Sequence, residues 1–138
     1  MKIEHVALQV SEPAAAAEWY VANLGFCVRR AVDQPVVARF LADSSGVVML
    51  ELYNNPRVPV PAYGSMDPLL LHVAFVCDEV PATVERLLKA GATLVAAPAL
   101  SGGDELAMLR DPWGLAIQLV RRRHPMLSPA SRSSANTC

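Results

Sequence analysis

The tripeptide at residues 5–7, HVA, occurs again 67 positions later at residues 72–74. A second segment, 48–53 (VMLELY), has an apolar counterpart at the same offset in 115–120 (LAIQLV). A fixed offset shared by two pairs of segments is typical of an internal repeat. The sequence therefore predicts two tandem copies of one structural unit.

Each copy is predicted to contain one strand, one helix and three further strands. Polar and apolar residues alternate in 3–10, which favours a strand. An alanine-rich stretch begins at Pro13 and ends before Gly25. Proline in the first turn and glycine just after the last are typical of a helix. In the second copy, an apolar stripe with helical spacing ends at Gly91. The predicted strands are 3–10, 26–32, 36–42 and 47–53 in the first copy, and 69–77, 93–97, 105–110 and 115–121 in the second.

The segments between these elements suggest turns and a linker. Residues 43–46 (DSSG) and 111–114 (DPWG) both begin with Asp and end with Gly, which is the preference of a type I turn. Residues 54–67 contain three prolines and are predicted to be an extended linker without a helix. The expected organisation is an α+β domain over 1–122, with module 1 at 1–53, module 2 at 68–122 and a disordered tail at 123–138.

Strand alternation places four polar residues on one side of the predicted sheets. If the helices cover the faces that carry Val6 and Leu8 in the first copy and Val73 and Phe75 in the second, the opposite faces carry a repeated polar pair. A glutamate between two leucines is costly to bury unless an opposite charge pairs with it, and a divalent cation would do so. The four residues are His5, Glu51, His72 and Gln118, and both pairs are separated by 46 positions.

Composition excludes several other classes of protein. More than half of the 138 residues are hydrophobic and only 18% are charged, which argues for a folded core rather than disorder. No apolar stretch is long enough for a membrane helix, and the first residues lack the apolar segment of a signal peptide. Residues 121–138 contain four arginines and no acidic residue. Residues 1–120 therefore contain the other 8 basic residues and all 13 acidic ones, which gives them a net charge near −5. An acidic body disfavours nucleic acid as a partner.

The three cysteines, Cys27, Cys77 and Cys138, lack the paired spacing of a metal site. An odd number of cysteines makes a poor disulfide framework. We therefore expect a cytoplasmic protein.

These motifs resemble the vicinal-oxygen-chelate superfamily, which includes glyoxalase I, methylmalonyl-CoA epimerase, extradiol dioxygenases, fosfomycin-resistance enzymes and bleomycin-binding proteins. The resemblance covers about residues 1–122. It rests on HVALQV, a helix ending in LGF, MLELYN, HVAFV, a helix ending in KAGA, and DPWGLAIQLV. It implies paired βαβββ modules that form a cleft around one metal, with ligands from the first and last strands of each module. Those positions are His5, Glu51, His72 and Gln118.

The ligand set differs from the most familiar members of the superfamily. Glyoxalase I usually has a carboxylate on the last strand of both modules, whereas the second position here is the amide of Gln118. Fosfomycin-resistance enzymes and extradiol dioxygenases usually have their carboxylate in the second module. Methylmalonyl-CoA epimerase resembles the mirror image of the present set. The two-fold symmetry of the repeat would let such an exchange preserve the geometry, so metal binding remains the expectation while the reaction stays open.

The resemblance implies a metal-dependent lyase or isomerase of the glyoxalase type, with Glu51 as the base and a small substrate that chelates the metal through adjacent oxygens. The metal could be nickel, zinc, manganese, cobalt or iron. Two alternatives remain: an iron(II) dioxygenase that uses His5, His72 and Glu51 as a facial triad, and a metal-free binding protein like the bleomycin-binding relatives. Related glyoxalases complete each cleft across a symmetric dimer, so a homodimer is expected.

Overall fold

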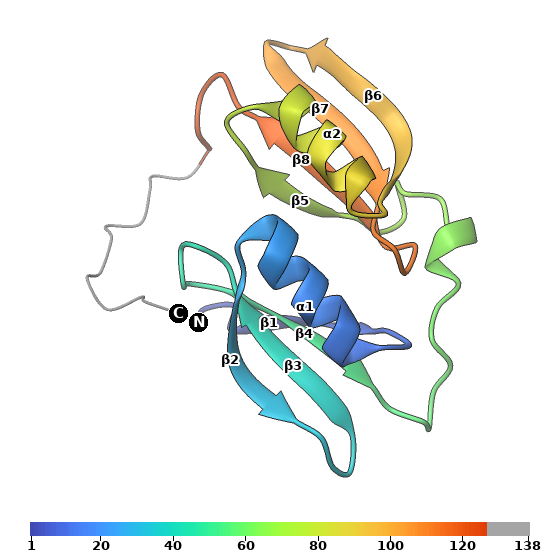
Figure 1. Cartoon of the computed structure of the whole chain (residues 1–138). Coiled ribbons are helices and arrows are strands. Elements are labelled where there is room, and N and C mark those ends of the chain that lie inside the picture. Colours follow the sequence, from blue (N-terminus) through green and yellow to red (C-terminus); the bar gives the residue numbers. More distant parts are fainter. Residues whose placement is uncertain (127–138) are drawn as a thin grey trace. The chain divides into compact units, whose positions relative to one another are not determined.

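The predicted repeat is present as two four-stranded sheets, each accompanied by one helix, in a computed structural model that describes residues 1–126 (Figure 1). The chain folds as two compact units, one made of Met1–Pro61 and the other beginning at Ala62. The α+β class and the paired βαβββ modules are thereby confirmed. Residues 127–138, which make up most of the predicted tail, lie outside the described residues.

The first unit runs strand, helix, three strands. Its elements are β1 (His5–Gln9), α1 (Pro13–Leu24), β2 (Cys27–Val32), β3 (Val37–Ala42) and β4 (Met49–Asn54). The strands are ordered β1-β4-β3-β2, with β1 parallel to β4 and the other neighbours antiparallel. Each strand overlaps its predicted segment closely.

The second unit repeats this topology. Its elements are β5 (Val73–Val76), α2 (Val80–Lys89), β6 (Thr93–Ser101), β7 (Asp104–Arg110) and β8 (Ala116–Arg121). The strand order is β5-β8-β7-β6, and β5 is parallel to β8. The first and last strands of each unit are therefore neighbours, which brings the predicted polar positions together within each sheet.

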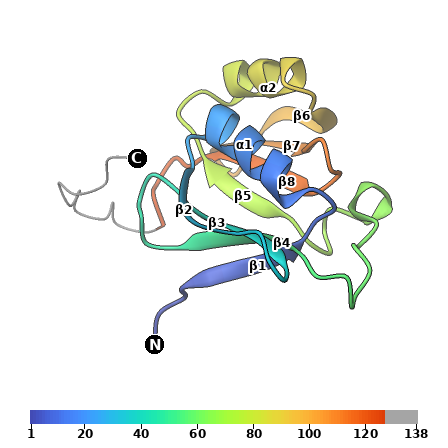
Figure 2. The same ribbon diagram turned by 60° about the horizontal axis from the view of Figure 1, so that its bottom comes forward.

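Helix α1 begins and ends at the predicted residues. Pro13 occupies the first turn, where its missing N–H costs nothing, and Gly25 adopts the left-handed conformation at φ 70° that ends the helix. Ala16, Ala17 and Tyr20 are buried. The helix lies along one face of the first sheet, against β3 and β4 (Figure 2).

Burial follows the predicted sidedness in β4, whereas in β8 the neighbours of Gln118 on its own face, Ala116 and Val120, are buried as well. Leu50 and Leu52 are 7% and 1% exposed, while Glu51 between them is only half-buried. Ile117 and Leu119 are likewise buried on either side of a half-buried Gln118. The apolar face of each sheet thus contributes to the core of its unit, and the polar pair is left on the other face.

Both predicted turns close with the expected hydrogen bond. The amide of Gly46 donates to the carbonyl of Asp43 at 3.1 Å, and the amide of Gly114 donates to the carbonyl of Asp111 at 2.9 Å. The buried carboxylate of Asp111 also accepts the amide of Leu115 at 2.9 Å. This local network fixes the entry into β8, which carries Gln118.

The prediction that the linker contains no helix is wrong, because Tyr63–Ser65 forms a short 3-10 helix, η1. The prolines end at residue 61, so the following backbone can turn. The guanidinium of Arg110 donates to the carbonyls of Tyr63 at 2.6 Å and Met66 at 2.7 Å, and so stabilises this turn from both sides. Residues 62–67 consequently belong to the second unit.

Strand β5 begins at Val73, four residues later than predicted. The Asp67 side chain accepts the amide of Leu69 at 2.9 Å, and its carbonyl accepts the amide of Leu70 at 2.9 Å. Such an Asx-type turn offers the backbone an alternative to strand pairing. His72 therefore lies immediately before the strand rather than within it.

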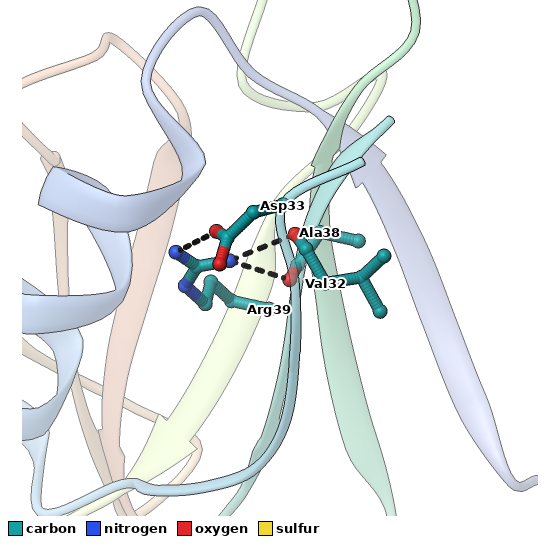
Figure 3. A network of polar contacts seen from close by, with 4 residues as sticks. All are labelled: Val32, Asp33, Ala38 and Arg39. Carbon is teal, nitrogen blue, oxygen red and sulfur yellow. Dashed lines mark hydrogen bonds and ion pairs between the residues drawn. The ribbon is translucent and has the colours of Figure 1, made fainter. Parts of the chain in front are cut away.

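An arginine ties the ends of β2 and β3 together. The guanidinium of Arg39 donates to the carbonyl oxygens of Val32 at 2.9 Å and Ala38 at 3.0 Å, and to the carboxylate of Asp33 at 2.7 Å (Figure 3). These bonds fix the hairpin that connects the two strands. Among the described residues, no helix is both long and apolar enough to cross a membrane.

Candidate metal-binding site

His5 and Glu51 meet on the face of the first sheet that α1 does not cover. His5 pairs with Met49, and Glu51 pairs with Ala7, so the two residues are diagonal neighbours on parallel strands. Their side chains approach to 3.3 Å between His5 Nε2 and Glu51 Oε2. The imidazole is 35% exposed and the carboxylate 20%, so the pair is accessible from solvent.

A second carboxylate approaches the other nitrogen of the same imidazole. His5 Nδ1 contacts Glu4 Oε2. The hydrogen bond with Glu4 raises the pKa of His5, and the negative charges of Glu4 and Glu51 raise it further. Two carboxylates beside one imidazole create a local negative potential that favours a cation at this position.

In the second unit, the corresponding histidine also has its Nδ1 occupied. His72 Nδ1 lies 2.9 Å from the carbonyl oxygen of Pro68. A carbonyl can only accept, so the proton of this bond belongs to Nδ1, and Nε2 is the nitrogen left to bind a metal. Gln118 pairs with Ala74 on the neighbouring strand. The second sheet thus repeats the histidine and oxygen-donor positions of the first.

The donors of the first unit suit a divalent metal. Zinc ligands lie at about 2.0–2.2 Å from the ion, so a nitrogen and an oxygen 3.3 Å apart can bind the same cation. Within residues 1–126, no group of three or more His, Cys, Asp or Glu side chains is assembled for metal binding. In the first unit, His5 and Glu51 are thus two possible donors that lie close together.

Phe40 is a neighbour of this site that the sequence did not reveal. It pairs with Glu51 across β3 and β4, and its ring makes an edge contact with the His5 imidazole at 5.5 Å between centroids. The guanidinium of Arg30 lies over the same ring at 5.8 Å. Both contacts depend on strand register, for which the sequence carries no local signal.

One known protein family matches most of the chain. A family model described as the Glyoxalase/Bleomycin resistance protein/Dioxygenase superfamily matches residues 2–119. The chain belongs to this superfamily. The resemblance inferred from the sequence is therefore confirmed. No curated protein gives a significant match.

Several solved structures share the fold. TnmS3, an antibiotic binding protein from Streptomyces sp. CB03234, is 23% identical with a TM-score of 0.69, and the match covers 88% of this chain and 95% of that one. SMU.1112c is 27% identical with a TM-score of 0.69, covering 88% and 98%. Glyoxalase I from Zea mays is 23% identical with a TM-score of 0.71, covering 88% of this chain but 44% of that longer chain.

Other polar residues near the superfamily's ligand positions have structural roles. Gln9 is buried, and its amide donates to the carbonyls of Asn55 at 2.8 Å and Val58 at 3.0 Å while its oxygen accepts the amide of Asn55 at 3.0 Å. Gln9 thus fixes the beginning of the linker. Asn55 also accepts the amide of Arg57 at 3.0 Å, which is the turn role expected of an Asn after a strand.

Proposed function

We propose that this protein is a metal-dependent lyase or isomerase of the glyoxalase type that acts on a small substrate with adjacent oxygens. His5, Glu51, His72 and Gln118 are the proposed ligands of one divalent ion. The observation that carries the proposal is the orientation of the histidines. In each, Nδ1 is held by an oxygen, Glu4 Oε2 or the Pro68 carbonyl, which leaves Nε2 as the donor for a metal.

This arrangement is the one that metal-binding histidines usually show. An oxygen partner on the remote nitrogen fixes the tautomer and orientation of the ring and makes the ligating nitrogen more basic. The presence of this feature in both copies of the repeat supports a ligand role more strongly than a packing role. The carboxylate at 3.3 Å from His5 Nε2 completes one half of the proposed set.

A bound divalent metal would supply positive charge to the adjacent oxygens of the substrate. Glu51 is the proposed base, and it removes a proton from the carbon beside the substrate carbonyl and returns it during the rearrangement. Gln118 holds its position as an uncharged oxygen donor and cannot accept this proton. The reaction therefore uses one base, and the proton returns on the face from which it left.

The function is tested by proton exchange in deuterated water. A panel of small 2-hydroxy and 2-oxo carbonyl compounds is incubated with metal-loaded protein, and loss of the C–H signal beside the carbonyl is followed by NMR. Exchange should occur with at least one compound and be abolished in Glu51→Gln, which keeps a ligand oxygen but loses the base. Equal exchange by the variant would exclude Glu51 as the base.

A second candidate is a metal-free protein that sequesters a small molecule. It is favoured by the open face around Phe40, where an aromatic ring is half-exposed beside a cation, and by the match with TnmS3 over 95% of that antibiotic binding protein. Metal analysis of protein purified without added metal separates this candidate from the first. Oxygen uptake with catechols in the presence of iron(II) would instead indicate the dioxygenase.

We also propose a cytoplasmic homodimer with a small-molecule substrate and no nucleic-acid partner. The formal net charge of −1, and the acidic excess over 1–120, support the exclusion of nucleic acid. We propose the dimer because the metal donors of the first unit could combine with those of the second unit of another chain as well as with those of the same chain.

A further inference from the structure

A β-bulge determines which residue of β2 faces the proposed site. Val28 pairs with Leu41, but the next pair is Arg30 with Phe40, so the register shifts at this point. Without the shift, Arg29 would pair with Phe40. Bulges often re-aim a side chain next to a functional site. Here the bulge brings Arg30 into the row that runs across the sheet through Phe40 to Glu51.

Arg30 and His5 flank the same aromatic ring. The Arg30 guanidinium carbon is 5.8 Å from the centroid of the Phe40 ring, and the His5 imidazole centroid is 5.5 Å from it. A cation within about 6 Å of a ring face is attracted by the ring quadrupole. Phe40 therefore holds the guanidinium over the face that carries the proposed ligands.

The charge of Arg30 is not neutralised by a carboxylate in the described part of the first unit. Three ion pairs there join His5 to Glu4, His5 to Glu51, and Arg39 to Asp33, and none of them includes Arg30. Arg39 shows the contrast, since its guanidinium donates to two backbone oxygens and is paired with the carboxylate of Asp33 (Figure 3). Arg30 keeps its planar, five-donor group available for an external anion.

We propose that Arg30 binds an anionic group, carboxylate or phosphate, at the end of the substrate remote from the metal. This inference rests on the proposed function, because it places the adjacent oxygens of the substrate at His5 and Glu51. Neighbouring strands are about 4.8 Å apart, so β4 and β2 are separated by about 10 Å. The substrate class is an anion of roughly this length, with a flat or apolar middle that lies on Phe40.

The test uses chelating probes that differ only in a remote charge. Hydroxamates bind metals through two adjacent oxygens, so metal-loaded protein is titrated with benzohydroxamate and with its 4-carboxy and 4-phosphono derivatives by calorimetry. Arg30→Gln should weaken the charged probes about tenfold, as expected for loss of one charge-assisted hydrogen bond, and leave benzohydroxamate unchanged. The ratio of the two charged probes distinguishes a carboxylate site from a phosphate site.

Arg57→Gln is the matched control, since it removes the same charge from an exposed position of the same unit. It should change none of the affinities. A loss in Arg30→Gln that is equal for neutral and charged probes, or no loss at all, would overturn the proposal. An equal loss in Arg57→Gln would attribute the effect to net charge and would also overturn it.

A metal-free measurement separates this proposal from the proposed function. The protein without metal is titrated with benzoate and benzamide while the Phe40 ring is observed by NMR. Benzoate should shift the Phe40 signals in the wild type and not in Arg30→Gln, even if the protein binds no metal at all. Equal shifts by benzoate and benzamide would refute the role of Arg30, whatever the metal analysis shows.

Discussion

Gly114→Ala should be among the most destabilising small substitutions in the second unit. A Cβ atom at this position would lie 2.6 Å from the backbone nitrogen of Gly64 and 2.9 Å from its Cα. Gly114 also has φ +90°, a conformation that residues with a side chain rarely adopt. The substitution therefore combines a backbone penalty with a contact that no side-chain rotation can relieve.

The size of the effect follows from these two parts. The left-handed backbone costs about 1–2 kcal/mol for a residue other than glycine. To relieve the contact, η1 must move away, and this weakens the bonds of Arg110 to Tyr63 and Met66, each worth about 1.5–3 kcal/mol. If these hydrogen bonds are weakened but not lost, the backbone cost and the weakened bonds together lower the free energy of unfolding by about 3–4 kcal/mol.

Urea unfolding measures this loss, with Gly102→Ala as the control. Gly102 lies in the same unit and has φ +61°, but a Cβ there would meet nothing within 4 Å. The control should therefore lose only the backbone part, about 1–2 kcal/mol. If the two variants unfold at the same urea concentration with the same slope, the close packing of η1 against the turn before β8 does not stabilise the fold.

Three further predictions concern the ligands, acid stability and assembly. Gln118→Glu should tighten binding of a divalent metal because it adds a negative charge to the proposed ligand set, and an unchanged dissociation constant by competition titration would place Gln118 outside it. The hydrogen bonds from Arg122 and from the Arg123 amide lower the pKa of Asp104 below 3.8, so the carboxylate stabilises the fold at neutral pH and this contribution is lost as the pH falls through the folded-state value. The stability difference between wild type and Asp104→Asn should accordingly shrink below pH 3.8, and a difference that does not vary with pH would contradict the assignment. Finally, if a site is shared across a dimer, an equal mixture of His5→Ala and His72→Ala chains should regain about a quarter of the wild-type metal after complete subunit exchange, because half of the dimers are mixed and each mixed dimer has one intact site of two. Chains proven to exchange that stay metal-free would exclude a shared site.

The repeat explains why so much of the fold could be predicted. Matching segments 67 residues apart gave the order of elements twice, and alternation around Glu51 gave the correct sidedness of β4. These signals are local, since they depend on periods of two or 3.6 residues and on Pro and Gly at helix ends. Such local patterns predict a helix or strand correctly whenever the folded protein buries one face of that element.

The parts that the sequence did not reveal depend on partners far away in the chain. The turn at Tyr63 is stabilised by Arg110, which lies 47 residues later, and nothing around Tyr63 predicts this bond. The position of Arg30 over Phe40 is set by a bulge in strand pairing, which a reading based on strict alternation misses. The start of β5 was predicted too early because the Asx turn at Asp67 competes with the strand.

The central claim is that one histidine from each copy of the repeat binds the same divalent metal. The most direct test is the metal content, by elemental analysis, of wild type, His5→Ala, His72→Ala and His124→Ala after dialysis against a limiting divalent metal. His124 is the third histidine of the chain and has no place in the proposed site, so its variant should retain the wild-type stoichiometry. His5→Ala and His72→Ala should each lose most of the metal while their circular dichroism is unchanged. Full metal content in either of these two variants would contradict the account.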